Sequence, residues 1–354
     1  MSGKRVVVAP LDWGLGHATR CIPIIEELQK RNCEVFIASS GSALMLLRKE
    51  FPGLKFFELA SYNIAYSKRI PFGLSILLQI TKILRTISKE QLQLQEIIDQ
   101  NKIDLAISDN RYGCWSTQVP SIFICHQLNL QLPVVLKLLQ PIVNYFHHRS
   151  IRKFTQCWIP DQPGKFNLTG ELSKGLSFPT QYIGILSRFI KTQVETKYDL
   201  AVILSGPEPQ RTILEEIIFK QIQNQNLKIV LVRGVIENEV TWKHEGNISV
   251  VNYLQTYDLQ EVISQSKLII ARSGYSTIMD LARLGRKAIL IPTPGQTEQE
   301  YLAHRLLDKG ICYVVSQEKF NLTDALTKSN SFLGFSNIES ENELLSQALD
   351  EVLK

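Results

Sequence analysis

No part of this 354-residue sequence has the composition of a signal peptide, a transmembrane helix, a short-period repeat or a low-complexity tract. The N-terminus runs directly into Val6–Val8, which is far too short for the apolar core of a signal peptide. The most apolar stretch, residues 70–87, is interrupted by proline, glycine and polar residues, so it cannot span a bilayer, although it could lie on one. We therefore expect a cytoplasmic protein, either free or peripheral at the inner face of the cell membrane.

The sequence also has few cysteines, and they are far apart. Its six cysteines stand at positions 21, 33, 114, 125, 157 and 312, and no two of them form a CxxC pair. This spacing argues against a zinc cage or a redox dithiol and favours buried, reduced thiols. An Asp-x-Asp pair at the end of a predicted strand is missing too, so we expect neither a metal ion nor a cofactor.

Strong charge of either sign is absent. Apolar residues make up 44% of the chain and charged residues 21%, as in folded globular proteins. The formal net charge of +5 is too small to indicate nucleic-acid binding. It favours smaller anionic partners such as nucleotides and diphosphates, or an acidic membrane surface. The length of the chain predicts two domains of similar size.

Short β-branched runs alternate with helical patterns, which predicts an α/β fold with parallel sheets. In the first half we expect strands at 5–9, 34–39, 55–59, 105–108, 121–125 and 157–160, and helices at 17–30, 41–50, 74–100 and 130–146. In the second half we expect strands at 199–204, 228–232, 249–251, 268–271, 288–291 and 312–315, with a helix at 210–223. The predicted domains are 1–188 and 189–338, followed by a helix at 339–354 that packs back on the first domain.

Two glycines and two basic residues follow the first predicted strand, in the run WGLGHATR at 13–20. Loops at the carboxyl ends of parallel strands line the ligand crevice, and glycines there let the backbone approach a ligand closely. The run is not a dinucleotide-binding fingerprint, because Thr19 stands where the third glycine would be. We expect His17 and Arg20 to be functional. The alternative is a tight turn with an incidental histidine.

A second polar run, SDNRYG at 108–113, follows another strand of the same predicted sheet and would face the same crevice. A carboxylate beside an imidazole orients its tautomer and raises its basicity, so Asp109 next to His17 would make a base for a sugar hydroxyl. Asp109 could equally cap a following helix. The neighbouring His126 and Asn129 suit a polyhydroxylated ligand, with a helix cap at Asn129 as the alternative.

The strongest signal is the run RSGYST at 272–277, between a predicted strand and a predicted helix. Gly274 permits a tight turn, and the N–H groups and dipole of the following helix suit a diphosphate. The hydroxyls of Ser273 and Ser276 can donate to it, and Asp280 lies less than two turns further, within reach of a ribose diol. Capping of the helix by Ser273 is compatible with the same geometry.

Two further loops are expected to approach the same ligand. The run SGPEPQR at 205–211 follows the first strand of the second domain and supplies Arg211 as a cation. The run TPGQTEQE at 293–300 joins a strand to a helix, and its carboxamides and carboxylates suit sugar hydroxyls. Such residues are also ordinary at the start of a helix.

Together these motifs resemble the GT-B glycosyltransferases of family 28, in particular those that transfer N-acetylglucosamine in peptidoglycan synthesis. The order GxGHxxR, HQLN, RSGYSTIMDLARLG and IPTPGQTEQEYLAHRL carries the resemblance over nearly the whole chain. It implies two Rossmann-like domains whose sheets face each other across a cleft. It further implies that the first domain binds the acceptor, the second binds the nucleotide-sugar, and transfer is inverting and independent of metal.

The resemblance also implies roles for single residues. His17 and Asp109 correspond to a catalytic base dyad, and acceptor binding falls to Gly16, Arg20, Arg111, His126 and Asn129. Donor binding falls to Ser205, Gly206, Arg211, Arg272, Ser273, Gly274, Tyr275, Ser276, Asp280, Gln299 and Glu300. Among these, 273–276 would hold the diphosphate, Asp280 the ribose, and 299–300 the sugar. The chain departs from the family at 205–211, where prolines without N–H groups replace a glycine-rich loop, and at Glu300, which replaces a carboxamide.

The favoured function is therefore inverting transfer of a sugar from a uridine diphosphate sugar to a hydroxyl, which the resemblance suggests is on a lipid-linked acceptor. A nucleotide-sugar epimerase of the same fold and a non-catalytic nucleotide-sugar-binding protein are the alternatives. Residues 64–89 bear on the acceptor, because a helix from Leu74 would carry an apolar stripe with Lys82 and Arg85 beside it. This helix either packs on its own sheet or rests on an anionic bilayer.

Overall fold

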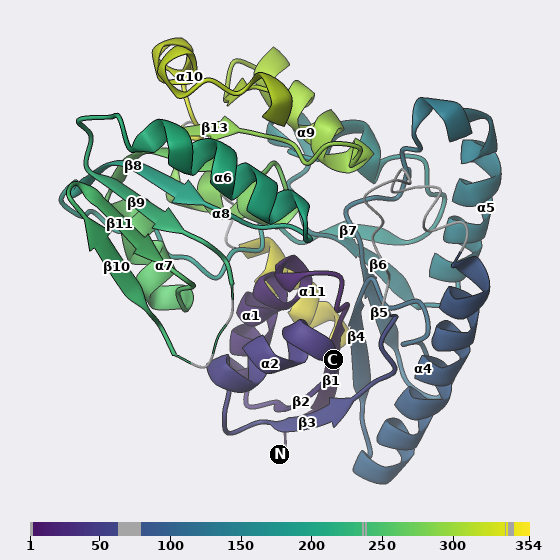
Figure 1. Ribbon diagram of the computed structural model, residues 1–354. Helices are drawn as coiled ribbons and strands as arrows, with labels where there is room; N and C mark the ends of the chain where they lie inside the picture. Colours follow the sequence, from purple (N-terminus) through teal and green to yellow (C-terminus); the bar gives the residue numbers. More distant parts are fainter. Residues whose placement is uncertain (1–2, 63–78, 236, 238, 337, 339–342) are drawn as a thin grey trace. The chain divides into compact units, whose positions relative to one another are not determined.

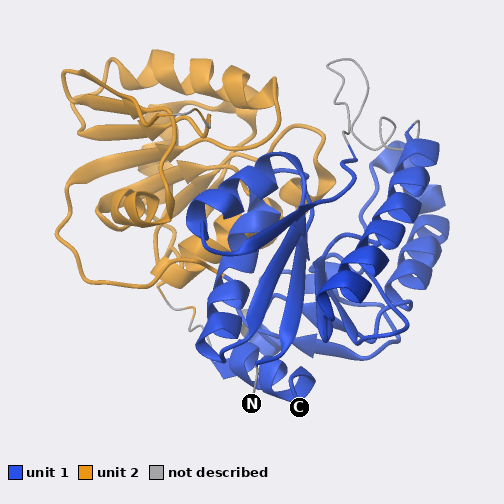
Figure 2. Ribbon diagram, turned by 90° about the horizontal axis from the view of Figure 1, so that it is seen from below, with its two compact units in different colours: residues 1–186, 340–354 blue, residues 187–339 orange. Residues whose placement is uncertain are grey.

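The computed structural model describes residues 3–62, 79–235, 237, 239–336, 338 and 343–354. The chain divides into two compact units, one of residues 1–186 with 340–354 and one of residues 187–339 (Figure 2). Each unit is built around one seven-stranded sheet with helices, so the predicted α/β class is confirmed. Within the described ranges, no helix is both long and apolar enough to cross a membrane.

The first unit contains a wholly parallel sheet in the order β3-β2-β1-β4-β5-β6-β7 (Figure 1). Its strands are β1 (Arg5–Pro10), β2 (Glu34–Ser39), β3 (Lys55–Glu58), β4 (Leu105–Asp109), β5 (Ser121–Ile124), β6 (Gln156–Ile159) and β7 (Thr180–Tyr182). The valines of β1 have no exposed surface. A parallel strand inside a sheet with helices on both faces is buried on both sides, which explains this continuous apolar run.

The helices of this unit are α1 (Leu15–Lys30), α2 (Gly41–Glu50), α4 (Ile80–Asn101), α5 (Gln140–Ile151) and α11 (Glu343–Val352), with 3-10 helices η1 (Val134–Leu139), η2 (Gly164–Phe166) and η3 (Gly170–Ser173). Figures 1 and 2 show α1 and α2 on one face of the sheet and α4 and α5 on the other. The terminal helix α11 packs on α1, where Arg31 donates to Asp350 at 3.0 Å and to the Ser346 hydroxyl at 2.7 Å.

The second unit contains a sheet in the order β10-β11-β9-β8-β12-β13-β14, parallel except for β10. Its strands are β8 (Tyr198–Ile203), β9 (Ile229–Val232), β10 (Trp242–Glu245), β11 (Ile248–Val251), β12 (Ser266–Ala271), β13 (Ala288–Leu290) and β14 (Tyr313–Val314). Its helices are α6 (Gln210–Ile222), α7 (Thr256–Ser264), α8 (Tyr275–Leu284), α9 (Thr297–Asp308) and α10 (Leu322–Ser329), with the 3-10 helix η4 (Gln317–Lys319).

The structure differs from the predicted elements in a few places. The single helix expected at 130–146 is wrong. The structure has η1 and then α5, which continues to Ile151, because Pro141 suits the first turn of a new helix. Strands β7 and β10 and helices α7 and α10 had not been predicted. The beginning of the helix expected at 74–100, and most of the apolar and basic segment 64–89, lie outside the described residues. From Ile80 onward the helix is present as α4.

Each sheet has one place where the winding of the chain changes direction. The first unit proceeds from β1 outward to β3 and then returns to β4 beside β1, and the second unit returns from β9 and its neighbours to β12 beside β8. In open α/β sheets, ligands bind outside the carboxyl ends of the strands at such points. The loops there begin at residues 11 and 110 in the first unit and at 204 and 272 in the second.

Candidate active site

The first candidate site lies at the ends of β1 and β4. Asp109 is the last residue of β4 and pairs in register with Pro10 at the end of β1. Gly14, with φ at 91°, turns the chain after β1, and α1 begins at Leu15, so that His17 lies in its first turn. Side chains with a Cβ rarely adopt that φ, which explains the first glycine of the motif.

Four side chains meet at this site: His17, Arg20, Asp109 and His126. The Nδ1 of His17 lies 3.0 Å from Oδ1 of Asp109. Arg20 makes a two-pronged ion pair with Asp109, in which its Nε donates to Oδ2 at 2.5 Å and its Nη2 donates to Oδ1. The Nη1 of Arg20 donates to Nδ1 of His126 at 3.0 Å. The structure thus places the expected base dyad and two expected acceptor-binding residues in one hydrogen-bonded cluster.

The charges in this cluster compensate one another. Burial disfavours the ionised form of Asp109, but Arg20 and His17 outweigh it and hold the pKa of this carboxyl well below its usual value. Burial lowers the pKa of His17, and the charge of Asp109 opposes this only in part. His17 is therefore neutral near pH 7. Two groups lie within hydrogen-bonding distance of Nδ1 of His17: the Asp109 carboxylate, which can only accept, and Nη2 of Arg20 at 2.9 Å, which can only donate. In the tautomer whose Nδ1 donates to Asp109, Nε2 keeps the lone pair that a base needs.

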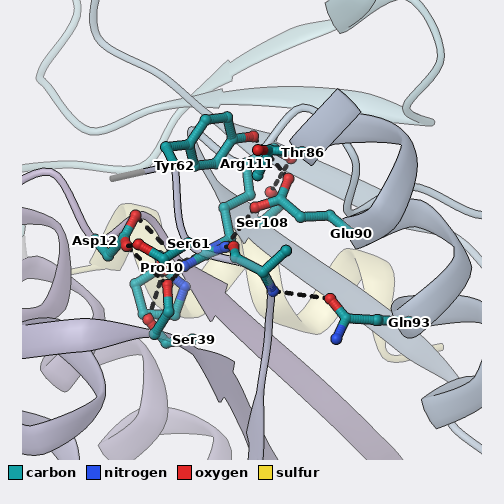
Figure 3. A network of polar contacts seen from close by, with 12 residues as sticks. Pro10, Asp12, Ser39, Ser61, Tyr62, Thr86, Glu90, Gln93, Ser108 and Arg111 are labelled. Carbon is teal, nitrogen blue, oxygen red and sulfur yellow. Dashed lines mark hydrogen bonds and ion pairs between the residues drawn. The ribbon is translucent and has the colours of Figure 1, made fainter. Parts of the chain in front are cut away.

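Arg111, which was expected to bind the acceptor, is instead fully buried in a neighbouring network (Figure 3). Its guanidinium donates to the carbonyl oxygens of Pro10 and Ala60 at 2.8 and 3.2 Å. It also donates to the Ser40 hydroxyl at 2.6 Å and forms an ion pair with Glu90 of α4. With no exposed surface and five protein partners, the fifth being Oδ1 of Asp12 at 3.7 Å, Arg111 joins the loops after β1, β2 and β3. We correct the expectation accordingly, from a ligand contact to a structural role.

The same network contains two polar atoms that the sequence did not single out. Asp12 accepts through Oδ2 from the hydroxyls of Ser40, at 2.8 Å, and Ser61 (Figure 3). The Oδ1 of Asp12 and the indole Nε1 of Trp13 are buried and have no hydrogen-bond partner in the described part of the chain, although Nη2 of Arg111 forms an ion pair with this Oδ1 at 3.7 Å. Buried polar atoms are normally hydrogen-bonded, so these two are candidate contacts for a ligand. Their position directly after β1 was the signal that could have identified them.

Asn129 and Gly16, the remaining expected acceptor-binding residues, have different surroundings. The side chain of Asn129 accepts from Nδ2 of Asn144 on α5 at 2.9 Å. No helix begins at Asn129, since η1 starts at Val134, so the alternative of a helix cap there is wrong. Likewise no helix follows Asp109 directly. Gly16 belongs to the first turn of α1.

The second candidate site lies at the ends of β8 and β12. Arg272 follows β12 directly and is only 1% exposed. It donates to the carbonyl oxygens of Ile291 and Pro292 at 3.3 and 3.2 Å. It also donates to the Gln210 carbonyl at 2.7 Å and to Oε1 of Gln317 at 2.5 Å. The guanidinium of Arg272 thus links the start of α6, the connection between β13 and α9, and η4 by hydrogen bonds.

The positive charge of Arg272 is not compensated by a carboxylate among its partners in the described ranges. Its Nε is buried and has no hydrogen-bond partner there. Burial lowers the pKa of Arg272 to about 10, so the side chain is still charged at neutral pH. A buried cation of this kind is stabilised by a bound anion.

Helix α8 begins directly beyond this arginine, with Gly274 as its N-cap residue and no side-chain cap. Ser273 is fully buried, and its hydroxyl donates to the Gln299 carbonyl oxygen at 2.8 Å. The capping alternative for Ser273 is therefore wrong, and its hydroxyl is engaged within the protein. The dipole of a helix favours negative charge at its N-terminus, so the start of α8 suits a diphosphate.

The expected sugar contacts, Gln299 and Glu300, hold their own loop in this structure. Gln299 accepts from the backbone N–H of Thr293 at 2.8 Å and donates to Gln296 at 2.5 Å. Glu300 accepts from the backbone N–H of Gly295 at 3.0 Å. Both side chains would have to exchange these bonds to contact a sugar.

Thr293 begins this loop and was not among the expected donor-binding residues. It is 2% exposed, and its Oγ1 has no hydrogen-bond partner in the part of the chain that the structure describes. A Cβ added to Gly206, in the loop after β8, would lie 3.8 Å from this Oγ1. Gly206 has φ at 100° and is exposed, and the preceding Ser205 is half-buried. This loop therefore lies beside an unsatisfied hydroxyl.

Arg211 does not act as the expected uncompensated cation. Its Nε donates to Glu208 and its Nη1 to Glu215, each at 2.6 Å. Glu208 stands three residues before Arg211 and Glu215 four residues after it, so the charge of Arg211 is neutralised by its sequence neighbours. We correct its expected role from a phosphate contact to support of the loop after β8.

Asp280 lies in the second turn of α8, where the ribose contact was expected. It accepts from the Ser187 hydroxyl at 2.6 Å. Burial raises the pKa of Asp280 to about 6, and the nearby charge of Arg188 and the bond from Ser187 oppose this only in part. The carboxylate is thus mostly ionised above pH 6, and protonation below it would remove an acceptor.

Comparisons with known proteins find similarity to glycosyltransferases. Residues 208–349 match the model of the glycosyltransferase family 28 C-terminal domain. An uncharacterized glycosyltransferase of Methanosarcina mazei is 23% identical over 84% of this chain and 82% of its own. The UDP-N-acetylglucosamine–N-acetylmuramyl-(pentapeptide) pyrophosphoryl-undecaprenol N-acetylglucosamine transferase of Sulfurihydrogenibium sp. is 20% identical over 98% of this chain and 99% of its own. MurG of Acinetobacter baumannii superposes with a TM-score of 0.60 at 14% identity, covering 99% of both chains. The resemblance expected from the motifs is confirmed.

Proposed function

We propose that this chain transfers a sugar from a uridine diphosphate sugar to an acceptor hydroxyl with inversion, because it has the GT-B fold and its residues 208–349 match the C-terminal domain of glycosyltransferase family 28. In this proposal the acceptor binds at the first unit and the donor at the second. The observation that carries the proposal is a neutral His17 whose Nδ1 is held 3.0 Å from Asp109. Such an imidazole is ready to accept a proton at Nε2.

The proposed reaction is a single displacement. The Nε2 of His17 takes the proton of the acceptor hydroxyl, and the acceptor oxygen forms a bond to C1 of the donor sugar. The bond from C1 to the diphosphate oxygen breaks, and its electron pair leaves on the diphosphate. Asp109 stabilises the imidazolium that forms and keeps it oriented. One displacement on C1 inverts its configuration, and His17 returns its proton to solvent.

The donor is proposed to place its diphosphate at the start of α8 and its ribose near Asp280. The dipole of α8 and the uncompensated charge of Arg272 would then face the negative charge that develops on the leaving group. Because these groups belong to the chain itself, the proposed reaction needs no metal ion. Thr293 is a further candidate for a polar contact with the donor.

The acceptor is proposed to be a lipid-linked sugar. The Sulfurihydrogenibium relative is named for transfer to a pyrophosphoryl-undecaprenol acceptor. A chain that acts on such an acceptor has to work at a membrane surface, so we also propose a peripheral location at the inner face of the cell membrane. His126 and Asn129 would contact the acceptor sugar.

The test uses the full chain and a panel of uridine, thymidine, guanosine and adenosine diphosphate sugars. A bound donor raises the melting temperature by mass action, so thermal shift identifies the nucleotide. The selected donor is then incubated with and without total membrane lipids, and the released nucleoside diphosphate and the sugar are followed. Transfer releases the diphosphate and labels a lipid. An epimerase would change the sugar without lipid labelling, and a binding protein would do neither, and either outcome would overturn the proposal.

A further inference from the structure

The second unit has a cavity at the end of α8 that lies opposite the candidate donor site. The cavity has a volume of about 430 Å³ and is lined by the segment 191–194, by Ser264 at the end of α7 and by residues 284–286 at the end of α8. All of these residues belong to the second unit. A volume of this size is typical of pockets that bind small organic molecules.

Helix α8 separates this cavity from the candidate donor site. That site was assigned to the start of the helix, where Gly274 is the N-cap residue, whereas the cavity lies at the C-cap residue Gly285. The ten residues of α8 span about 15 Å. Arg286 of the cavity also donates to the carbonyl oxygen of Ser266, the first residue of β12, whereas Arg272 follows the last residue of that strand. The cavity is therefore a separate place from the donor site.

The cavity contains a buried hydroxyl without a partner. Ser264 is 5% exposed, and its Oγ has no hydrogen-bond partner in the described part of the chain. Most buried polar side-chain atoms are hydrogen-bonded, so this hydroxyl is a candidate contact for a ligand. A serine hydroxyl can donate to an oxygen of an anion.

Both charged side chains described in the lining are positive. The Nζ of Lys191 lies 3.3 Å from the place where a Cβ on Gly285 would stand. Lys191 has no hydrogen-bond or ion-pair partner among the described residues. Arg286 has the Ser266 carbonyl as its partner, and burial lowers the pKa of its guanidinium. A desolvated cation of this kind is stabilised by an anion.

The dipoles of the two helices offset only part of this positive charge. Both α7 and α8 end at the cavity, and a helix C-terminus carries roughly half an elementary negative charge. The two C-termini thus compensate about one of the two positive charges, and about one remains. A ligand with a single negative charge therefore suits the cavity better than a neutral molecule does.

We propose that this cavity binds a small organic monoanion, namely an aliphatic or aromatic carboxylate. The carboxylate would accept from Lys191, Arg286 and the Ser264 hydroxyl, and the apolar part of the ligand would pack on Leu284. The segment 191–194 follows closely on the start of the second unit at residue 187, so binding would hold this segment against α7 and α8. The proposal does not depend on sugar transfer.

Binding is tested by calorimetry on the full chain with hexanoate and benzoate, and with hexanamide and benzamide as their neutral counterparts. The carboxylates are expected to bind at one site and the amides at least about tenfold more weakly, because the amides lack the charge. Carboxylate binding should weaken as salt is raised and should persist with saturating uridine diphosphate. No binding by either carboxylate, equal binding of acids and amides, or displacement by uridine diphosphate would overturn the proposal. Each of these outcomes leaves the proposed function standing.

Charge variants locate the site. Val194→Glu places a carboxylate in the lining and should weaken carboxylate binding about tenfold or more by repulsion. Val240→Glu is the matched control, because both valines belong to the second unit and are 41% exposed. Lys191→Gln should weaken binding about two- to fivefold, whereas the exposed Lys243→Gln should bind as wild type does.

The buried hydroxyl is tested by Ser264→Ala, which should weaken carboxylate binding about threefold. Ser329→Ala is its control, since Ser329 also ends a helix and is 5% exposed. Hydrogen exchange should slow in peptides covering 191–194 when benzoate is present. Unchanged affinity in all the cavity variants, equal losses in their controls, or unchanged exchange at 191–194 would place the ligand elsewhere and refute the proposal.

Discussion

The two units carry candidate sites at the same point of the same topology. The buried arginine of the first site is paired with a carboxylate, whereas that of the second is not. In the first unit Arg20 and Asp109 neutralise each other, and His17 is uncharged. In the second unit Arg272 is held by carbonyl and carboxamide oxygens, with no carboxylate among its described partners. A compensated cluster can accept a proton, whereas an uncompensated cation attracts an anion. Topology thus sets where each site lies, and local compensation of charge sets what it can do.

The largest effect is expected from breaking the compensation in the first unit. Asp109→Asn leaves Arg20 buried without its counter-ion, which costs about 3–5 kcal/mol of folding free energy. Because the pKa of Asp109 is lowered in the folded state, its contribution is present above about pH 4 and is lost as the pH falls below that value. Denaturant midpoints should therefore differ strongly at pH 7 and converge in acid. The exposed Asp99→Asn is the control, and an unchanged midpoint for Asp109→Asn would contradict the ion pair.

Removing the base should affect turnover alone. His17→Ala is expected to lower turnover about a hundredfold or more while donor affinity stays near wild type, since a positioned base contributes to the chemical step. Asp109→Asn should lower turnover less, because Asp109 orients the base. Release of nucleoside diphosphate measures the rate and calorimetry the affinity, with the exposed His244→Ala as the control. Normal turnover in His17→Ala would show that His17 is not the catalytic base.

Removing the positive charge of Arg272, the uncompensated cation of the second unit, should weaken binding of the donor. Arg272→Met is expected to weaken binding of uridine diphosphate more than tenfold, because both the charge and the link between three segments are lost. Arg272→Lys keeps the charge without the planar fork and should fall between wild type and Arg272→Met. Calorimetry at two salt concentrations measures both. Equal affinity in all three proteins would show that the charge does not serve the donor.

The smallest expected effect concerns the ribose contact. Asp280→Asn should weaken nucleotide binding about tenfold at pH 7.5, by loss of a charged acceptor. Because the pKa of Asp280 is raised to about 6, wild-type affinity should fall as the pH drops through 6, and the affinity of Asp280→Asn should not. Calorimetry across this range gives both curves. Parallel curves for the two proteins would remove Asp280 from the binding site.

Much of the fold could be predicted because local pattern and burial agree. The run Val6–Val8 is apolar throughout, as a strand buried on both faces requires, and β2 and α2 were predicted with their observed bounds. The approach of His17 to Asp109 was predictable too, since parallel strands end at one edge of a sheet. Strand β10 was missed because all four of its residues are exposed and it carries no alternation.

The network around Arg111 could not be derived in the same way. Its partner Glu90 lies on the buried side of α4, four residues before Leu94, so a single acid in an apolar helical stripe was the available signal. Which cation would meet that acid depended on the loops after β1, β2 and β3 coming together. Long-range pairing of this kind leaves no periodic pattern in the sequence.

The sequence by itself determined the α/β class, the family resemblance and the loops that carry the polar residues, because these follow from short-range periodicity and from motifs. Only the tertiary structure decided which of those residues are neutralised within the chain and which keep a charge or a polar atom unsatisfied. In the folded chain, partners within the protein accept hydrogen bonds from Arg111, Arg211 and the Ser273 hydroxyl. It also exposed the apolar face of α5. The physical reason is that a side chain's partners come from distant segments, so its charge and burial are settled only when those segments pack.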